Sequence, residues 1–171
     1  MKFLIMLVMF LFASASSYAD EFNVSVALVK NNQEVCCKTT SSIAIIGTKT
    51  WGTNYLIGID GYFAPGLGAG IKVGKKLNDW TIFVGTGLFT DSLTKGIDVN
   101  GTDVSTSSGG VANTVYTEAH YKKFFARYTL SSANFDLFAT RTDGNGNTFT
   151  GTENVSTNDS SLWIGLKFNT Q

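Results

Sequence analysis

Proline, cysteine, histidine and charged residues are all scarce in this sequence. Its 171 residues include one proline, two cysteines, one histidine and 15% charged residues. No apolar run reaches the roughly 20 residues that a membrane-spanning helix needs, which excludes a helical inner-membrane protein. The 13 basic residues are balanced by 13 acidic residues, so no positive excess would attract a phosphate backbone. We therefore predict no nucleic-acid partner.

The residue groups that mark common enzymes and metal sites are also missing. The sequence contains no glycine-rich phosphate loop, no cysteine and histidine cluster and no nucleophile elbow. Asp98, Asp103, Asp143 and Asp159 lie in polar segments, but their spacing matches no defined calcium loop. We predict no cofactor, no metal site and no ordinary enzyme activity.

The two cysteines, Cys36 and Cys37, are adjacent. A disulfide between neighbouring residues closes a small, strained ring. A free pair, a vicinal disulfide and intermolecular pairing therefore all stay open.

The N-terminal segment has the three parts of a secretory signal peptide. It carries the basic residue Lys2, an apolar run over residues 3–12 and the small-residue exit Ser17-Tyr18-Ala19. This pattern is typical of a signal that is removed during export. We predict a cleaved signal peptide over residues 1–19 and one exported domain over residues 20–171.

Glycine, aromatic residues and small polar residues are abundant, and they occur in short alternating segments. There are 18 glycines and 13 phenylalanines. Apolar and polar residues alternate over segments of about ten residues, which is typical of strands with one apolar and one polar face. The predicted strands cover 22–29, 42–51, 55–63, 66–77, 80–88, 113–130, 135–140 and 162–168.

The predicted connections alternate between two lengths. An even number of strands, with short turns on one rim and longer loops on the other, is typical of bacterial outer-membrane barrels. Long polar loops are expected at 31–41, 91–112 and 143–160, and short turns at 52–54, 78–79 and 131–134.

Seven aromatic residues are predicted to lie on the apolar faces of their strands, near the rim of short turns. Rings at one depth on one face form an interfacial girdle, which a bilayer explains better than a soluble core does. A secreted, soluble β-sandwich that acts as a binding module is the alternative interpretation of the same alternation. The predicted girdle consists of Phe22, Trp51, Tyr55, Trp80, Tyr128, Phe135 and Phe168.

Charged residues on the opposite faces are predicted to point into the barrel. A cation that faces the middle of a bilayer from a strand costs about 2–4 kcal/mol, so these side chains must avoid lipid. We expect Asp60 to pair with Lys72 across one hairpin, and Arg127 to pair with Asp136 across another. The ion pairs are predicted to serve structure.

The interior of an eight-stranded barrel is narrow enough for side chains to fill it. The sequence therefore predicts an eight-stranded antiparallel transmembrane up-and-down β-barrel with a side-chain-filled lumen and no diffusive transport. Glycines on the inward faces are expected to make room for the lumen-filling rings. Those rings are Phe83, Phe125, Phe138 and Trp163.

Two segments carry a resemblance to a known group of proteins. The glycine-rich run over residues 66–80, with its Asn78-Asp79 turn and Trp80 restart, resembles small outer-membrane barrels of the opacity and porin-like superfamily. The segment from Leu162 to Phe168 resembles the terminal strand that the outer-membrane assembly machinery recognises. The resemblance implies a bacterial outer-membrane protein whose partners are outer-membrane lipid and that machinery.

We predict a non-enzymatic protein whose long loops meet the outside of the cell. Adhesion, envelope integrity and interaction with host or phage are all compatible, and the sequence does not specify the extracellular ligand. A lipid-modifying enzyme is a further alternative, because His120, Asp91 and Ser92 resemble in type the residues of lipid A palmitoyltransferases. In that family the histidine comes first along the chain and an amphipathic helix precedes the barrel. Neither feature is found here.

Overall fold

The computed structural model describes residues 21–33, 38–64 and 66–169. The predicted signal peptide and the Cys36–Cys37 pair lie outside these residues, so both stay predictions. The described part contains no helix that is long and apolar enough to cross a membrane.

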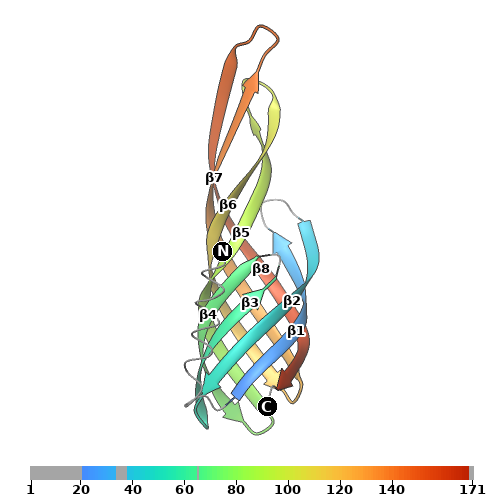
Figure 1. Ribbon diagram of the computed structural model, residues 1–171, viewed down its shortest axis with the longest axis vertical. Helices are drawn as coiled ribbons and strands as arrows, with labels where there is room; N and C mark the ends of the chain where they lie inside the picture. Colours follow the sequence, from blue (N-terminus) through green and yellow to red (C-terminus); the bar gives the residue numbers. More distant parts are fainter. Residues whose placement is uncertain (1–20, 34–37, 65, 170–171) are drawn as a thin grey trace.

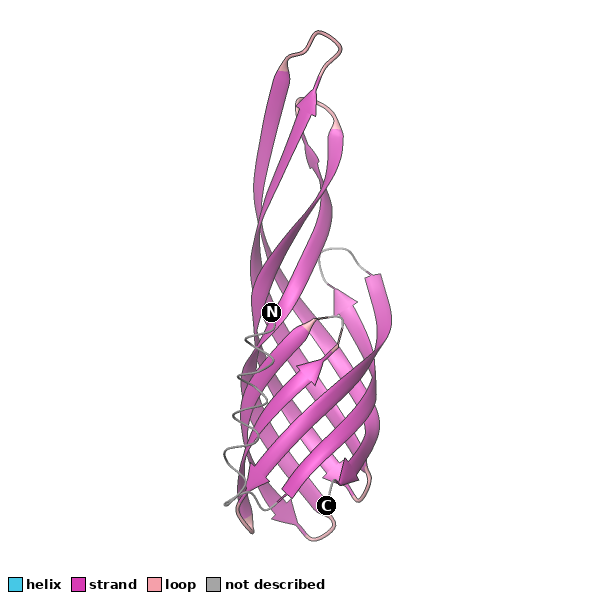
Figure 2. Cartoon of the chain, in the orientation of Figure 1, coloured by secondary structure: helices cyan, strands magenta, loops and turns pink. Residues whose placement is uncertain are grey.

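Eight antiparallel strands account for almost all of the described residues (Figures 1 and 2). Each strand pairs with its neighbours in the sequence, and β1 also pairs with β8, which closes the sheet into a barrel. This confirms the predicted eight-stranded up-and-down barrel and rules out the β-sandwich. The strands are β1 (Glu21–Gln33), β2 (Lys38–Trp51), β3 (Tyr55–Phe63), β4 (Leu67–Leu77), β5 (Trp80–Asp98), β6 (Asp103–Tyr121), β7 (Phe124–Thr142) and β8 (Thr148–Asn169).

The strands fall into two length classes. β3 and β4 have 9 and 11 residues, which is the length that a tilted strand needs to cross a bilayer. β5, β6 and β7 have 19 residues each and β8 has 22. The extra residues rise above the ring as two hairpins (Figure 1). We call this part the projection: residues 90–98, 103–112, 133–142 and 148–159.

Strand pairing shows where the projection leaves the barrel. The β4–β5 pairing ends at Phe89, the β6–β7 pairing ends at Asn113 and Ser132, and the β1–β8 pairing ends at Ser160. Above that level only the β5–β6 and β7–β8 pairings continue. The closed ring therefore opens into two separate two-stranded hairpins.

In the barrel, the outward faces of the strands are apolar. Leu28 is 69% exposed, Ile71 is 62% exposed and Val84 is 57% exposed. Outward residues of the other strands, such as Ile57 and Ile164, are exposed to a similar degree. A continuous exposed apolar surface of this kind is unusual for a soluble protein and marks a site of contact with lipid or protein.

In the projection, the apolar face is the inner one. The two hairpins pack together through a cluster of nine buried apolar residues. The Lys95–Glu153 ion pair (2.6 Å) and a hydrogen bond from Thr106 Oγ1 to the carbonyl oxygen of Phe138 (2.7 Å) also join them. The buried cluster consists of Leu93, Ile97, Val99, Ala112, Ala133, Phe135, Leu137, Ala139 and Val155.

The turn predicted at 131–134 is wrong. The structure places the β6–β7 turn at Lys122 and Lys123, and residues 131–134 lie inside β7. Lys122 has φ of 53°, the left-handed conformation that two-residue hairpins use. Lysine gives no turn signal, whereas a run of Ser, Ala and Asn does. The predicted strand 113–130 is therefore made of two strands, and the predicted strand 135–140 is the outer half of β7.

Two of the long loops predicted from composition are also largely wrong. Most of 91–112 and of 143–160 is paired strand, and only the tips at 99–102 and 143–147 connect the strands. Serine, threonine and asparagine are abundant there because they cover the outward face of the hairpins. The polar composition of these segments thus indicates that they are exposed to water. It does not indicate whether they form paired strands.

Candidate functional site

The barrel interior holds a network of four buried charged residues from four strands. Asp60 comes from β3, Lys72 from β4, Glu118 from β6 and Arg127 from β7. All four side chains are at most 2% exposed. Each lies on an inward face because the alternation of its strand turns apolar neighbours outward, as with Ile71 and Val73 around Lys72.

Every cation in this network contacts both carboxylates. Lys72 Nζ lies 2.9 Å from Asp60 Oδ1 and 2.6 Å from Glu118 Oε1. Arg127 Nη2 lies 2.6 Å from Asp60 Oδ2, and Arg127 Nε donates to Glu118 Oε2 at 2.5 Å. Two positive and two negative charges thus balance one another inside the wall. Such a network cross-links four strands of the barrel across its interior.

Neutral side chains complete the hydrogen bonding of the network. Thr48 Oγ1 donates to Asp60 Oδ1 at 2.8 Å, and the Tyr116 hydroxyl donates to Asp60 Oδ2 at 2.7 Å. The guanidinium of Arg127 also lies 4.2 Å from the centre of the Tyr116 ring. Tyr116 fits because its neighbours are glycines: a Cβ on Gly85 would lie 2.3 Å from its Cζ.

The structure brings Asp60 and Lys72 together and separates Arg127 from Asp136. Asp136 lies nine residues further along β7 and on the outward face, where it accepts a hydrogen bond from Asn154 at 2.7 Å. The prediction of an Arg127–Asp136 pair is wrong because it depended on the wrong turn at 131–134. Glu118, the true partner from β6, was missed. It becomes visible in the sequence only when the turn is placed at 122–123, which sets Glu118 opposite Arg127.

Three of the four predicted lumen rings lie inside. Phe83, Phe125 and Trp163 are at most 4% exposed, whereas Phe138 is 58% exposed on the outer face of the projection. The assignment of Phe138 to the lumen is wrong for the same reason as that of Asp136, since both were placed by the wrong turn.

Five of the seven predicted girdle residues lie near the rim of short turns. Tyr55, Trp80 and Phe168 are well exposed there, and Phe22 and Trp51 are partly buried. Tyr128 faces outward but lies midway along the barrel part of β7, opposite Leu162. Phe135 is wrong as a girdle residue because it is 1% exposed inside the projection. Tyr121 and Phe124, which flank the true turn, lie at the rim instead.

The structure separates the residues of the suggested lipid-modifying site. His120 pairs with Thr81 near the rim of short turns, and its Nε2 lies 2.5 Å from Glu118 Oε1. Ser92 pairs with Gly109 in the projection. Thr81 and Ser92 are 11 residues apart along β5, roughly 35 Å of extended strand. His120 and Ser92 therefore cannot act on one substrate, and the suggestion of a catalytic set is wrong.

Two aromatic contacts form a layer above the ion network. The Tyr62 ring stacks on Phe89 at 5.9 Å between centroids and meets the edge of Trp163 at 5.5 Å. Arg127 lies below this layer, with its guanidinium 5.6 Å from the Trp163 ring. The layer separates the ion network from the outer end of the barrel.

A cavity of about 160 Å³ lies above the aromatic layer. Asp91 and Asp159 line it, together with several hydroxyl and amide side chains. Burial raises the pKa of Asp91, the amide of Ser92 opposes this effect, and the nearby Asp159 carboxylate adds to it.

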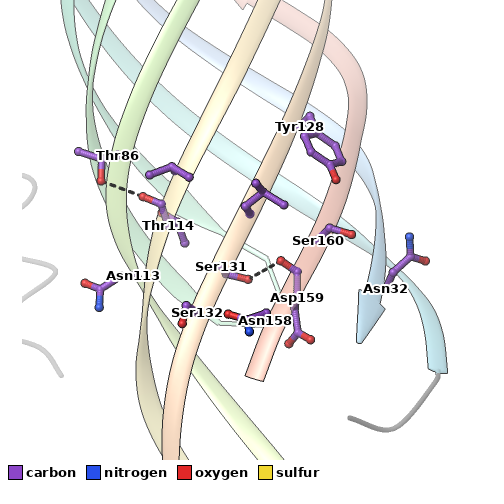
Figure 3. A pocket seen from close by; sticks show the side chains of 12 residues that line it. Asn32, Thr86, Asn113, Thr114, Tyr128, Ser131, Ser132, Asn158, Asp159 and Ser160 are labelled. Atoms are coloured by element: carbon purple, nitrogen blue, oxygen red, sulfur yellow. Dashed lines mark hydrogen bonds between the residues drawn. The ribbon is translucent and has the colours of Figure 1, made fainter. Parts of the chain in front are cut away.

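A wider groove of about 670 Å³ opens on the outer wall where β6 and β7 separate (Figure 3). Its lining changes along the strands from apolar side chains such as Leu130 to amides and hydroxyls such as Asn113, Ser132 and Asn158. The groove marks the level at which the outward surface changes from apolar to polar. Among the described residues, no group of three or more histidine, cysteine, aspartate or glutamate side chains is placed to hold a metal ion.

The fold is similar to that of two solved barrels. One is the N-terminal β-barrel domain of Pseudomonas aeruginosa OprF, with 12% identity and a TM-score of 0.39 over 85% of this chain and 97% of that chain. The other is Neisserial surface protein A, with 10% identity and a TM-score of 0.41 over 89% of this chain and 99% of that chain. No protein-family model and no curated protein matches the sequence. The fold assignment rests on the strand pairing of this chain.

Proposed function

We propose that this chain is a non-enzymatic, integral protein of the bacterial outer membrane that displays its projection outside the cell for binding. One observation carries the proposal: the apolar face of the same strands is outward in the barrel and inward in the projection. On β7, Tyr128 and Leu130 are exposed in the barrel, whereas Phe135 and Leu137 are buried in the projection. A strand that leaves a bilayer for water has to change in this way.

The side chains inside the barrel support a role in display over a role in transport. The ion network and the aromatic layer both reach across the described interior of the barrel. The walls are closed by backbone hydrogen bonds on every side, which a protein in lipid requires. The chemistry of the protein therefore lies on its outer surface.

Heat modifiability tests the membrane part of the proposal. The full-length chain is expressed in a Gram-negative host, outer membranes are isolated, and gel mobility in SDS is compared with and without boiling. We expect a band in this fraction whose mobility shifts on boiling. A soluble periplasmic band without a shift would contradict the proposal.

Epitope tags test the orientation. One tag is inserted after Gly144 at the tip of the β7–β8 hairpin, and a matched tag is inserted after Thr53 in the β2–β3 turn. On intact cells, antibody should bind the tag at Gly144 and should reach the tag at Thr53 only after permeabilisation. The reverse pattern would place the projection in the periplasm.

A trimmed barrel tests whether the projection binds. The strand register allows Thr90 to be joined to Val111, and Ser132 to Asn158, each through an Asn-Gly turn, because these residues are paired. Cells with equal amounts of full-length and trimmed barrel are compared for adherence to host cells and for phage adsorption. Loss of either property on trimming supports a binding role. Unchanged adherence and adsorption would leave only a structural role in the envelope.

We also propose that the end of β8 is the contact for the outer-membrane assembly machinery. Leu162, Ile164, Leu166 and Phe168 alternate outward along it. The variant Phe168→Ala should assemble more slowly in cells but refold normally into detergent. Equal assembly in cells would remove this role from Phe168.

A further inference from the structure

The two ends of the molecule carry opposite charges. The projection lies at one end and the short turns lie at the other (Figure 1). Residues 90–112 and 133–159, which form the projection and its tips, include seven acidic and two basic residues. At the end with the short turns, four exposed lysines lie in or next to the turns, and we call them the basic rim: Lys75, Lys76, Lys122 and Lys123.

The positive charge of the basic rim is not balanced within the described part of the chain. None of the four lysines makes an ion pair with a described residue. Glu21 is paired with Lys167 at this end. Asp79 is then the one acidic side chain of the described rim that is left to face four ammonium groups. The basic rim therefore has a net positive charge that an external anion can balance.

Lys75 lies at the level where the apolar outer surface of the barrel ends. The outward residues before it on β4, Ile71 and Val73, are 62% and 61% exposed, and Lys75 follows them in the same alternation. Its partner on β3 is Tyr55, an exposed ring. Exposed tyrosine and tryptophan rings are enriched at the depth of lipid headgroups. Lys75 thus faces sideways from the barrel wall at headgroup depth.

Aromatic rings accompany two lysines of the basic rim. Lys75 Nζ lies 5.3 Å from the centre of the Tyr55 ring, and Lys122 Nζ lies 5.2 Å from the centre of the Tyr121 ring. The Tyr121 ring in turn packs against Trp80 at 4.8 Å between centroids. A cation over a ring keeps its N–H donors. Both ammonium groups therefore remain able to bind an anion at the depth of the rings.

The four lysines occupy one arc of the barrel on ordered turns. They lie on β4 and at the β6–β7 turn, and β5 joins these strands by direct pairing. The amide of Lys76 donates to the carbonyl oxygen of Asn54 at 2.9 Å, and the amide of Lys167 donates to that of Lys123 at 2.7 Å. The basic rim is thus a fixed, contiguous surface.

We propose that the basic rim binds the phosphate groups of anionic phospholipids in the leaflet at this end of the barrel. The proposal rests on the membrane assignment made under the proposed function. Lysine is a compact point charge on a flexible stem, which suits a phosphate in a fluid layer. Each lysine near an anionic lipid surface strengthens the attraction to it.

The direction of Lys75 favours a lipid over an acidic protein or the cell wall. This side chain follows the same outward face as Val73, so its ammonium lies beside the headgroups of the lipids that contact the wall. The acidic projection would be repelled by the same anionic lipids. The charge pattern therefore favours one orientation of the barrel across the bilayer.

Quenching of Trp80 by brominated lipids measures the preference for anionic headgroups. Trp51→Phe removes a second tryptophan from this rim, and Trp163 is 4% exposed inside the barrel. The chain is purified from expressing cells and reconstituted in vesicles of phosphatidylcholine and phosphatidylglycerol, with first one and then the other lipid brominated. At low salt, we expect about fivefold tighter binding of phosphatidylglycerol around Trp80. Higher salt should reduce the preference because it screens exposed charges.

Substitution of three lysines tests whether the basic rim is the cause. Glutamine in place of Lys75, Lys122 and Lys123 together should abolish the preference, whereas arginine at the same positions should retain it. Lys30→Gln is the matched control, because Lys30 is exposed on the outward face of β1 at the opposite end of the barrel and should not affect Trp80. The gel shift on boiling verifies that each variant is folded. A preference that survives the triple glutamine substitution would overturn the proposal.

The two brominated lipids also separate this inference from the membrane assignment. If neither lipid quenches Trp80, the chain does not enter bilayers, and the proposed function fails together with the inference. Equal quenching by both lipids would show that the chain enters bilayers without selecting anionic headgroups, which overturns the inference alone. Equal quenching together with lysine-dependent sedimentation with purified peptidoglycan would assign the basic rim to the cell wall instead.

Discussion

The projection continues four of the eight strands of the barrel, and the two regions have opposite cross-sections. In the barrel, apolar residues such as Val84 face outward and a charged network fills the inside. In the projection, polar residues such as Thr94 face outward and residues such as Leu137 form an apolar core. The β5–β6 and β7–β8 pairings continue unchanged from the barrel into the projection. The surroundings of the strand decide which face is apolar, because lipid and water favour opposite surfaces.

The apolar face switches from the outside to the inside within a few residues of each strand. Leu88 on β5, Leu130 on β7 and Leu162 on β8 are the last exposed apolar residues of the barrel on these strands. The next outward residues are Thr90, Ser132 and Ser160. On all three strands, the outward residues thus change from apolar to polar near the end of the barrel.

The largest expected effect is the loss of Arg127. Arg127→Met leaves the carboxylates of Asp60 and Glu118 with Lys72 as their remaining buried cation, so the barrel should lose about 3–5 kcal/mol. Urea unfolding in lipid vesicles, followed by tryptophan fluorescence, measures this loss. Arg141→Met is the control, because Arg141 is half-buried near the tip of the projection and should change stability by about 0.5 kcal/mol or less. Equal losses would mean that the network does not support the barrel.

A lysine scan of one strand face tests the comparison between the two regions. Val84 and Thr94 are both outward on β5, in the barrel and in the projection respectively. Val84→Lys should cost about 2–4 kcal/mol in a bilayer, whereas Thr94→Lys should be nearly neutral. Refolding into vesicles and urea titration measure both variants. Similar costs at both positions would mean that no boundary lies between them.

The core of the projection should unfold separately from the barrel. Leu137→Ala removes a side chain that is 1% exposed, and we expect a loss of about 2–3 kcal/mol, at the low end for a leucine in a core. Limited proteolysis should cleave the projection of this variant faster. The gel shift of the barrel on boiling should persist. Loss of that shift would show that both regions unfold as one unit.

The smallest expected effect concerns the tip of the β7–β8 hairpin. The side chain and backbone amide of Asn147, and the backbone amide of Asn145, donate hydrogen bonds to Asp143 and hold its pKa below the usual value. The ionised carboxylate therefore orders the tip above the ordinary pKa of about 3.9, and this order is lost as the pH falls through the lowered value. Amide exchange at Asn145 and Asn147 measures the effect. Asp143→Ala should exchange fast at every pH, and protection in that variant would contradict the role of Asp143.

The sequence predicts the barrel strands well because the alternation of apolar and polar residues can be recognised within each short segment. The strand from Tyr55 to Phe63 was predicted with its observed ends, and so was the Asn78-Asp79 turn. The alternating apolar residues that were assigned outward in the barrel, such as Leu28, Ile71 and Val84, are exposed there. The Asp60–Lys72 pair followed from this assignment, since both residues fall on inward faces of one hairpin.

The assignment of apolar residues to the outward face fails where the strands continue into the projection. Phe135 was placed outward because it is apolar, yet it lies inside the projection, where the apolar face is inward. The wrong turn at 131–134 placed Asp136 and Phe138 inward at the same time. The alternation of apolar and polar residues does not by itself show whether the outward face of a strand contacts lipid or water. The sequence of β7 does contain a signal of this change. Its alternating apolar residues have even numbers up to Leu130 and odd numbers from Ala133 onward.

The measurement that tests the central claim most directly is a nitroxide scan along the outward face of β7 in vesicles. Cys36 and Cys37 are first replaced by serine, and single cysteines are labelled in turn at Ala126, Tyr128, Leu130, Ser132, Asn134 and Asp136. Collisions with dissolved oxygen report lipid, and collisions with a water-soluble nickel complex report water. We predict that oxygen dominates up to Leu130 and that nickel dominates from Ser132 onward. Uniform access to the nickel complex along the whole strand would contradict the account.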